Sequence, residues 1–243
     1  MNLVLVESDE INAGELRLSG PRAAHLLKVL HVAPGHEVRI GVIDGPRGVG
    51  TVQAIADGTV TLRYALDGDA PPRPAIDLLL AVPRPKVMRR LWAQIAALGV
   101  GRIILTNAAK VERNYFDSHI LSPESYRPLL IEGLQQARDT RLPAVSIHRQ
   151  FKVLVEDQLD ALVGQAARIV ADPSATRGLS DVVRGAVEER VLLAVGPEGG
   201  WNAFELGLLE THGFLRGGMG SRILRSDTAC VALLAIASAR FQI

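Results

Sequence analysis

The sequence is poor in cysteine and has no long apolar segment. Its single cysteine, Cys230, cannot form an internal disulfide, and no cysteines or histidines recur at the spacing of metal ligands. The longest apolar runs, such as Ala229–Ala237, are far shorter than the roughly 18 residues that a membrane span needs. The first ten residues have an acidic flank and lack the basic and apolar regions of a secretory signal. We therefore expect a cytoplasmic protein with no membrane span and no metal.

Several standard motifs are also absent. The chain has no G-x-x-x-x-G-K-[ST], which excludes a P-loop, and no G-x-S-x-G, which argues against an α/β-hydrolase. No G-x-G-x-x-G opens a helix after a strand, so a Rossmann dinucleotide site is unsupported. The six histidines are scattered and form no recognisable catalytic set with serine and aspartate.

What remains is an ordinary globular composition with an uneven distribution of charge. The 243 residues are 48% apolar and 22% charged with a net charge of +1, which suits one or two folded domains and excludes a disordered chain. Residues 84–149 carry 11 basic and 5 acidic side chains, a local excess of +6. This excess fits either a surface that binds a polyanion or the solvated faces of amphipathic helices.

A proline-rich stretch, Asp67–Ala75, divides the chain. Before it, short alternating segments predict strands, and the Asp-Gly pairs at Asp44 and Asp57 are hairpin signals. One helical stretch, Ala23–Val32, interrupts them. The predicted strands are Leu3–Glu7, Glu15–Leu18, Glu37–Ile43, Gly50–Ile55 and Thr59–Ala65. The sequence thus predicts a small β-barrel over residues 1–70.

After the linker, apolar runs alternate with helical patterns, which predicts an α/β domain with a mostly parallel sheet over residues 71–243. The helical segment Lys86–Leu98 places its apolar residues on one face and its basic residues on the other, and Trp92 is expected in the core. The predicted strands are Ile76–Val82, Arg102–Thr106, Ala144–Ile147, Arg168–Ala171 and Val191–Val195.

Two glycine-rich loops stand out in this domain. Ligands of parallel sheets bind at the carboxyl ends of the strands, and GPEGG, Gly196–Gly200, directly follows a predicted strand. Asn202 and Glu205 then form a capping-box pattern for the next helix. A plain turn is the alternative reading, although the charged Glu198 among loop glycines favours function.

The second loop, GGMGSRILRSD, leads into a helix expected to start near Ser226 or Asp227 and to run to Arg240. Both residues have an obvious alternative role as helix caps. Ile223 and Leu224 lie between glycines and arginines, where a core role is hard to explain, and could form an apolar wall for a flat ring.

The segments GPEGGWNAFE (Gly196–Glu205) and MGSRILRSDTA (Met219–Ala229) resemble the knot-forming motifs of the RsmE family, the 16S rRNA uridine-N3 methyltransferases of the SPOUT superfamily. His25–Gly45 is similar to the family's PUA-like N-terminal barrel, and Lys86–Thr106 to the start of its catalytic domain. The resemblance implies a PUA-like RNA-binding barrel over residues 1–70 and a SPOUT domain with a deep C-terminal trefoil knot over 71–243. It also implies a homodimer that uses S-adenosylmethionine and no metal, with 16S rRNA or the small ribosomal subunit as partner.

The same resemblance suggests roles for individual residues. The methyl donor would bind in the two loops, with adenine against Ile223 and Leu224. The N3 of uracil becomes nucleophilic when it loses its proton, so a cation should stabilise the anion and a carboxylate should take the proton. The expected catalytic residues are Arg225 and Asp227, with Glu198 as the reserve base. The expected donor-binding residues are Gly196, Pro197, Glu198, Gly199, Gly200, Met219, Ile223 and Leu224, and the expected RNA-binding residues are Lys86, Arg89, Arg90, Arg138 and Arg141.

The chain departs from the family pattern in its basic middle segment. Ala97 stands where the family usually has glutamate, and Gln135–Asp139 replaces a segment in which an acid and a later arginine are expected. Two alternatives therefore stay open at this point. One is another SPOUT methyltransferase that modifies ribose or a tRNA base, and the other is a non-catalytic RNA-binding assembly factor.

Overall fold

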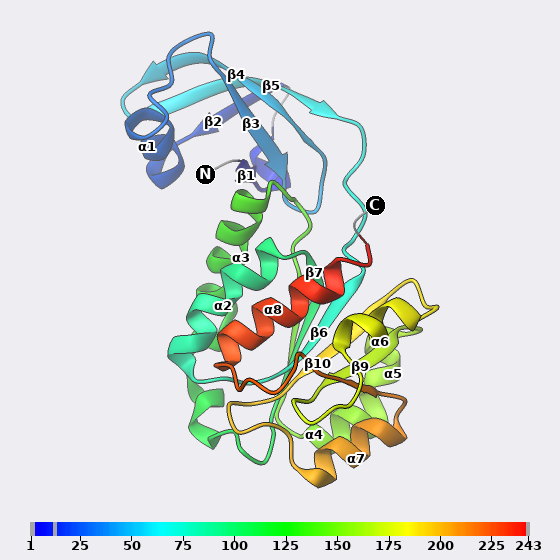
Figure 1. Cartoon of the computed structure of the whole chain (residues 1–243). Coiled ribbons are helices and arrows are strands. Elements are labelled where there is room, and N and C mark those ends of the chain that lie inside the picture. Colours follow the sequence, from blue (N-terminus) through cyan, green and yellow to red (C-terminus); the bar gives the residue numbers. More distant parts are fainter. Residues whose placement is uncertain (1–2, 12–13, 242–243) are drawn as a thin grey trace. The chain divides into compact units, whose positions relative to one another are not determined.

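The chain forms two compact units, each built around its own sheet (Figure 1). The computed structural model describes residues 3–11 and 14–241. Unit 1 comprises Met1–Arg73 together with Ile131–Leu142, and unit 2 comprises Pro74–Leu130 together with Pro143–Ile243.

Unit 1 contains a five-stranded sheet in the order β1-β3-β4-β5-β2. β1 pairs with β3 in parallel and the other pairs are antiparallel. At the predicted hairpin, Asp57 and Gly58 both have positive φ, of 49° and 73°, as a tight turn that follows the strand twist requires. The strands are β1 (Val4–Val6), β2 (Glu15–Leu18), β3 (Glu37–Val42), β4 (Arg47–Ala56) and β5 (Thr59–Asp67).

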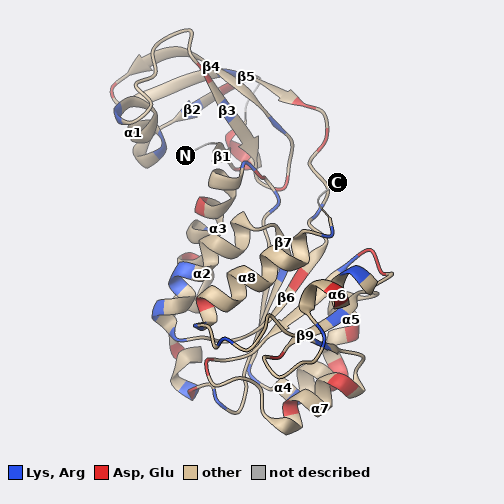
Figure 2. Cartoon of the chain, in the orientation of Figure 1, with Lys and Arg blue, Asp and Glu red and all other residues tan. Residues whose placement is uncertain are grey.

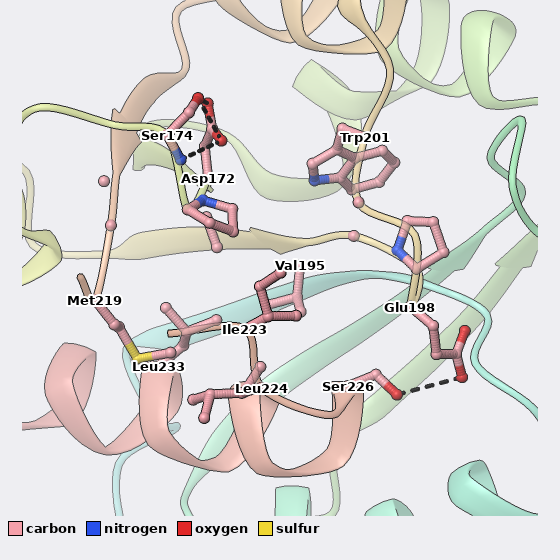
Figure 3. A pocket seen from close by; sticks show the side chains of 18 of the residues that line it. Asp172, Ser174, Val195, Glu198, Trp201, Met219, Ile223, Leu224, Ser226 and Leu233 are labelled. Carbon is pink, nitrogen blue, oxygen red and sulfur yellow. Dashed lines mark hydrogen bonds between the residues drawn. The ribbon is translucent and has the colours of Figure 1, made fainter. Parts of the chain in front are cut away.

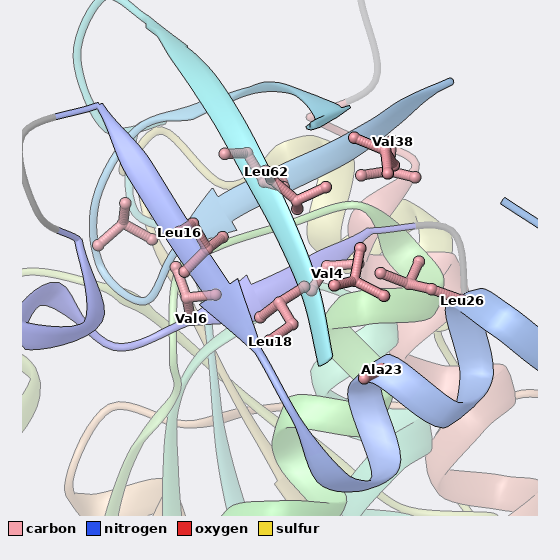
Figure 4. Packing of buried hydrophobic residues seen from close by; sticks show 12 residues of the cluster. Val4, Val6, Leu16, Leu18, Ala23, Leu26, Val38 and Leu62 are labelled. Carbon is pink, nitrogen blue, oxygen red and sulfur yellow. The ribbon is translucent and has the colours of Figure 1, made fainter. Parts of the chain in front are cut away.

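The core of unit 1 lies between this sheet and helix α1 (Gly20–Lys28) (Figure 4). Alternate residues of the strands point inward, as in β2, where Leu16 and Leu18 are fully buried and their neighbours exposed. Ala23 and Leu26 supply the buried face of α1. A short 3-10 turn, η1 (Ser8–Glu10), joins β1 to β2.

A segment distant in sequence completes unit 1. Helix α3 (Pro123–Ala137) crosses the boundary between the units, and its last turns and the following loop belong to unit 1. The Thr140 hydroxyl donates to the Gly45 carbonyl (2.7 Å), and the Asp44 amide donates to the Thr140 carbonyl (2.8 Å). The composition of the linker could not indicate this return of the chain.

Unit 2 contains a six-stranded sheet in the order β11-β9-β10-β6-β7-β8, with every neighbouring pair parallel. Its central strands β6 and β10 are buried at every position, which explains why their sequences are apolar except for Asp77, whose carboxylate pairs with Arg190 at 2.8 Å. The expected parallel α/β fold is therefore confirmed. The strands are β6 (Ile76–Ala81), β7 (Val100–Thr106), β8 (Ala144–His148), β9 (Ala167–Ala171), β10 (Val191–Val195) and β11 (Leu215–Gly217).

Helices cover both faces of this sheet. α8 (Ser226–Ser238) packs against α2 (Pro85–Ala97), α6 (Leu179–Gly185) and β10, so these helices share one face (Figure 1). Right-handed crossovers place α4 (Phe151–Val153), α5 (Leu159–Val163) and α7 (Ala203–Thr211) on the other. Two short 3-10 helices, η2 (Arg113–Asp117) and η3 (His119–Leu121), lie between β7 and α3. A π-helical segment, η4 (Leu154–Gln158), joins α4 directly to α5.

Helix α2 has the amphipathic pattern expected from its sequence. Trp92 is fully buried, its indole N–H donates to the Ile120 carbonyl (3.1 Å), and its ring lies 4.9 Å from that of Tyr126. Lys86, Arg89 and Arg90 are exposed on the opposite side. Within residues 3–11 and 14–241, no helix has the length and apolar character needed to cross a bilayer.

Candidate methyl-donor site and its surroundings

A cavity of about 400 Å³ opens in unit 2 at the carboxyl ends of β9, β10 and β11 (Figure 3). These three strands are neighbours in the sheet, so loops that are far apart in sequence meet there. The cavity is lined by Ala171–Ser174 after β9, by Val195–Trp201 and Leu206 after β10, by Gly217–Gly220 and Arg222–Leu224 after β11, and by Ser226, Ala229 and Leu233 of α8.

The structure brings both glycine-rich loops of the sequence to this one cavity. All eight residues expected to bind the donor line it: Gly196, Pro197, Glu198, Gly199, Gly200, Met219, Ile223 and Leu224. The Ile223 side chain is 89% exposed and Leu224 39%. Both are large apolar side chains that line the cavity and are open to solvent, so they are accessible to a ligand with an apolar surface.

At two positions of the first loop the structure explains why the residue is glycine. A Cβ on Gly196 would lie 3.1 Å from Cδ1 and Nε1 of Trp201, whose ring stacks on Phe151 at 5.3 Å and leaves little room to move. Gly200 has φ +70°, and its amide donates to the Pro197 carbonyl (2.8 Å), closing the turn. The predicted capping box then starts α7: the Glu205 amide donates to Asn202 Oδ1, and the Asn202 amide to Glu205 Oε2, both at 2.8 Å.

Sequence reasoning missed one wall of the cavity, the turn after β9. Asp172, 8% exposed, accepts hydrogen bonds from the amide and hydroxyl of Ser174 at 2.9 Å, and Arg216 lies 3.3 Å from its Oδ2. The available signal was the rule already applied to the other loops, because Asp172 is the first polar residue after the buried strand β9.

Glu198 sits at the edge of the cavity between two other segments (Figure 3). Its Oε1 accepts hydrogen bonds from the Ser226 hydroxyl and from the Arg84 amide, both at 3.3 Å. Ser226 is the first residue of α8, but its hydroxyl makes this contact rather than a helix cap. Both hydrogen bonds are longer than the usual distance of about 2.7–3.0 Å between such groups.

Arg225 and Asp227 flank Ser226 but do not line the cavity. Arg225 is exposed and is the N-cap residue of α8. Asp227 Oδ2 lies 2.6 Å from Nη2 of Arg90 on α2, and its other oxygen accepts from the Thr228 amide (3.0 Å). The Arg90 hydrogen bond is the main reason that the pKa of the Asp227 carboxyl lies below its usual value.

This ion pair predicts a pH-dependent contribution to stability. Because the folded pKa of Asp227 is below its unfolded value of 3.8, the stabilisation is present above about pH 4 and is lost as the pH falls through the folded pKa. We expect Arg90→Gln to lower the free energy of unfolding by about 0.2–1 kcal/mol at pH 7, and by less at pH 3.5. Urea unfolding at both pH values measures this, with Arg89→Gln on the same helix as control. A difference that grows at low pH would contradict the assignment.

The five residues expected to bind RNA fall into two groups. Lys86, Arg89 and Arg90 form a basic stripe on the exposed side of α2 (Figure 2). Arg138 and Arg141 belong to unit 1. The Arg141 side chain is only 19% exposed and donates to the carbonyls of Asp44 (3.1 Å) and Pro71. Its guanidinium is therefore engaged in contacts within unit 1.

The unusual Asp139 has a local explanation. Its Oδ1 accepts from the amides of Thr140 (2.6 Å) and Arg141 (3.1 Å), which stabilises the turn after α3, where Arg138 has a φ of +59°. Elsewhere, burial raises the pKa of the Cys230 thiol to about 12, so this thiol is unreactive at neutral pH. The described part of the chain holds no group of three or more His, Cys, Asp or Glu arranged for a metal ion.

Comparisons with known proteins agree with this architecture. A sequence model of the RNA methyltransferase domain matches residues 71–238. Ribosomal RNA small subunit methyltransferase E of Treponema pallidum is 30% identical over 242 residues, which cover 97% of this chain and 90% of the relative. Ribosomal RNA small subunit methyltransferase E 1 of Borreliella burgdorferi is 24% identical over 243 residues, covering 99% and 98%.

The fold has also been seen in crystals. The structure of ribosomal RNA small subunit methyltransferase E from Neisseria gonorrhoeae, bound to S-adenosyl methionine, superposes with a TM-score of 0.77 at 18% identity, over 98% of this chain and 97% of that one. The parallel sheet, the cavity at its carboxyl edge and the matched domain define an RNA methyltransferase. The chain belongs to the RsmE family.

Proposed function

We propose that the protein transfers a methyl group from S-adenosylmethionine to N3 of a uridine in the 16S rRNA of the small ribosomal subunit. The observation that carries the proposal is the meeting of three strand-end loops at one cavity, in a chain of this family. The relatives are named for the small-subunit rRNA that they modify, and the Neisseria gonorrhoeae structure holds S-adenosyl methionine.

The residues of the cavity fit this donor. Its volume of about 400 Å³ is within the range of small-molecule sites. Ile223, Leu224 and Leu233 would provide an apolar surface for adenine, and the loop glycines would let backbone amides and carbonyls reach its edge. The donor, when bound, supplies a methyl group already activated on a sulfonium, so the protein needs no metal to activate it.

The remaining task of the chain is to manage the acceptor proton. Asp227 is held by Arg90 with a lowered pKa, which makes it a poor base. Glu198 lines the cavity and has both of its hydrogen bonds on Oε1, so we assign to Glu198 the proton of uracil N3 as the nitrogen accepts the methyl group. Arg225, exposed at the start of α8, would stabilise the uracil anion.

The proposal includes the rest of the family architecture. After β11 the chain runs beside the loop after β9, where the Leu179 amide donates to the Gly218 carbonyl (2.8 Å) and the Gly218 amide donates to the Arg177 carbonyl (3.0 Å), and then enters α8. On this close pairing of the segment after β11 with the loop after β9 we base the proposal of a deep trefoil knot in residues 71–243. We further propose a PUA-like RNA-binding fold for residues 1–70, a homodimer and a cytoplasmic location.

Two measurements test the function. Calorimetry should detect binding of S-adenosylmethionine to the purified protein, and nucleoside mass mapping of 16S rRNA from a deletion strain should show the loss of one N3-methyluridine. Binding with loss of a different modified nucleoside would favour another SPOUT methyltransferase. Absence of binding at millimolar donor would favour an RNA-binding assembly factor instead.

For RNA contact we propose Lys86, Arg89 and Arg138, because Arg90 and Arg141 have partners within the chain. We expect Lys86→Glu combined with Arg89→Glu to weaken binding of a 16S rRNA fragment and to reduce the slope of log affinity against log salt by about 1.4–1.8. Lys152→Glu with Arg184→Glu changes the net charge equally at exposed positions of α4 and α6 and serves as control. An equal loss of affinity in both double variants would contradict a specific α2 surface.

A further inference from the structure

The loop after β7 contacts the loop Gly196–Gly200, which we call the donor loop. Lys110 Nζ donates to the Gly199 carbonyl at 2.5 Å. The stem of Lys110 also packs on Gly199, because a Cβ on that glycine would lie only 2.6 Å from Lys110 Cδ. The lysine therefore packs its stem on Gly199 and donates a hydrogen bond to the carbonyl of the same residue.

The backbone next to Lys110 is held by Glu205 of α7, the helix that follows the donor loop. Glu205 is 3% exposed, and its Oε1 accepts from the amide of Ala109 at 2.6 Å, while Oε2 accepts from the Asn202 amide at 2.8 Å. One buried carboxylate thus ties the residue before Lys110 to the segment that follows the donor loop. This arrangement fixes the point from which the lysine reaches Gly199.

The donor loop needs such support. Gly199 and Gly200 are adjacent glycines, and glycine loses more conformational freedom on ordering than any other residue. Within the loop, the Gly200 amide bonds to the Pro197 carbonyl at 2.8 Å. A charge-assisted hydrogen bond to the Gly199 carbonyl restricts the loop before ligand arrives, which reduces the entropy that binding must overcome.

We infer that Lys110 is a positioning residue that holds the donor loop in its binding conformation and so sets the affinity for S-adenosylmethionine. The inference rests on the proposed function. Lys110 is not among the described residues that line the cavity. It therefore acts through Gly199 rather than on the ligand. Its effect should therefore appear in donor affinity, while RNA affinity and the rate of methyl transfer at saturating donor stay nearly unchanged.

The test compares two variants. Lys110→Met keeps an apolar stem but removes the ammonium group that donates the hydrogen bond, whereas Lys110→Arg keeps a charged hydrogen-bond donor. Lys152→Met, at an exposed lysine of unit 2, is the control. Calorimetry with S-adenosylmethionine and with S-adenosylhomocysteine should give dissociation constants raised about tenfold for Lys110→Met, the effect of losing one charge-assisted hydrogen bond. The arginine variant should stay within about threefold of wild type. Amide hydrogen exchange at Gly199 and Gly200 should be faster in Lys110→Met alone.

The outcomes separate the inference from the function on which it rests. Wild-type donor affinity in Lys110→Met would overturn the inference and leave the function standing. A raised KM for RNA with unchanged donor affinity would also overturn it, because Lys110 would then contact RNA. If the wild-type protein itself failed to bind either ligand, the proposed function would fall, and the inference with it.

Discussion

Glu198→Gln is expected to lower the rate of methyl transfer about 100-fold, the usual scale for loss of a proton acceptor, with donor affinity within about threefold of wild type. Glutamine keeps the size of the side chain and an acceptor oxygen for the Ser226 hydroxyl and the Arg84 amide. It has no carboxylate to take the N3 proton. Single-turnover kinetics with saturating donor and RNA measure the transfer step directly.

Asp227→Asn is the matched comparison. Asp227 is engaged with Arg90 at 2.6 Å and lies outside the cavity lining, so its amide variant should slow transfer by no more than about fivefold, the cost of a weakened half-exposed ion pair. A larger loss of rate in Asp227→Asn than in Glu198→Gln would transfer the role of base to Asp227.

Gly196→Ala is expected to raise the dissociation constant for S-adenosylmethionine at least tenfold, which is about 1.4 kcal/mol. The new methyl group would lie 3.1 Å from the Trp201 ring, and this ring is 8% exposed and stacked on Phe151. Either the Trp201 ring or the loop Gly196–Gly200 must shift, and both of them line the cavity. Calorimetry at a temperature well below the unfolding midpoint measures the change.

Gly207→Ala provides the control for this substitution. Gly207 lies in α7, and a Cβ there would meet nothing within 4 Å. The control should bind donor like wild type and should be more stable by up to about 1 kcal/mol, because alanine favours helix over glycine. Equal donor affinity in the two alanine variants would show that the contact with Trp201 does not shape the cavity.

Most elements of the fold could be predicted because their sequences are simple. Val191–Val195 and Glu15–Leu18 are strands with the predicted bounds, since an apolar run and a strict alternation each define a strand. Strand β11 was not predicted, because Leu-Arg-Gly has neither an apolar run nor enough residues to show a period. It is held instead by pairing with β9, a contact that no local pattern encodes.

The site shows the same division between local and distant information. Glycines mark loops at strand ends, so two of the three loops that line the donor cavity were anticipated, and the loop after β9, which lacks glycine at its start, was not. The partners of the charged residues could not be, because Arg90 meets Asp227 and Lys110 meets Gly199 across long stretches of sequence. The sequence favoured Asp227 as the base with Glu198 in reserve, and the ion pair between Asp227 and Arg90 now reverses that order in favour of Glu198.

The return of Ile131–Leu142 to unit 1 matters for anyone who builds chimaeras from this family. An exchange of residues 1–70 alone would present Asp44 and Gly45 of one parent to Thr140 and Arg141 of the other. The graft must carry the later segment as well, so the transplantable module is discontinuous in sequence. Every residue that lines the donor cavity lies between Ala171 and Leu233, outside both grafted pieces. Such an exchange could therefore be made without rewriting the cavity.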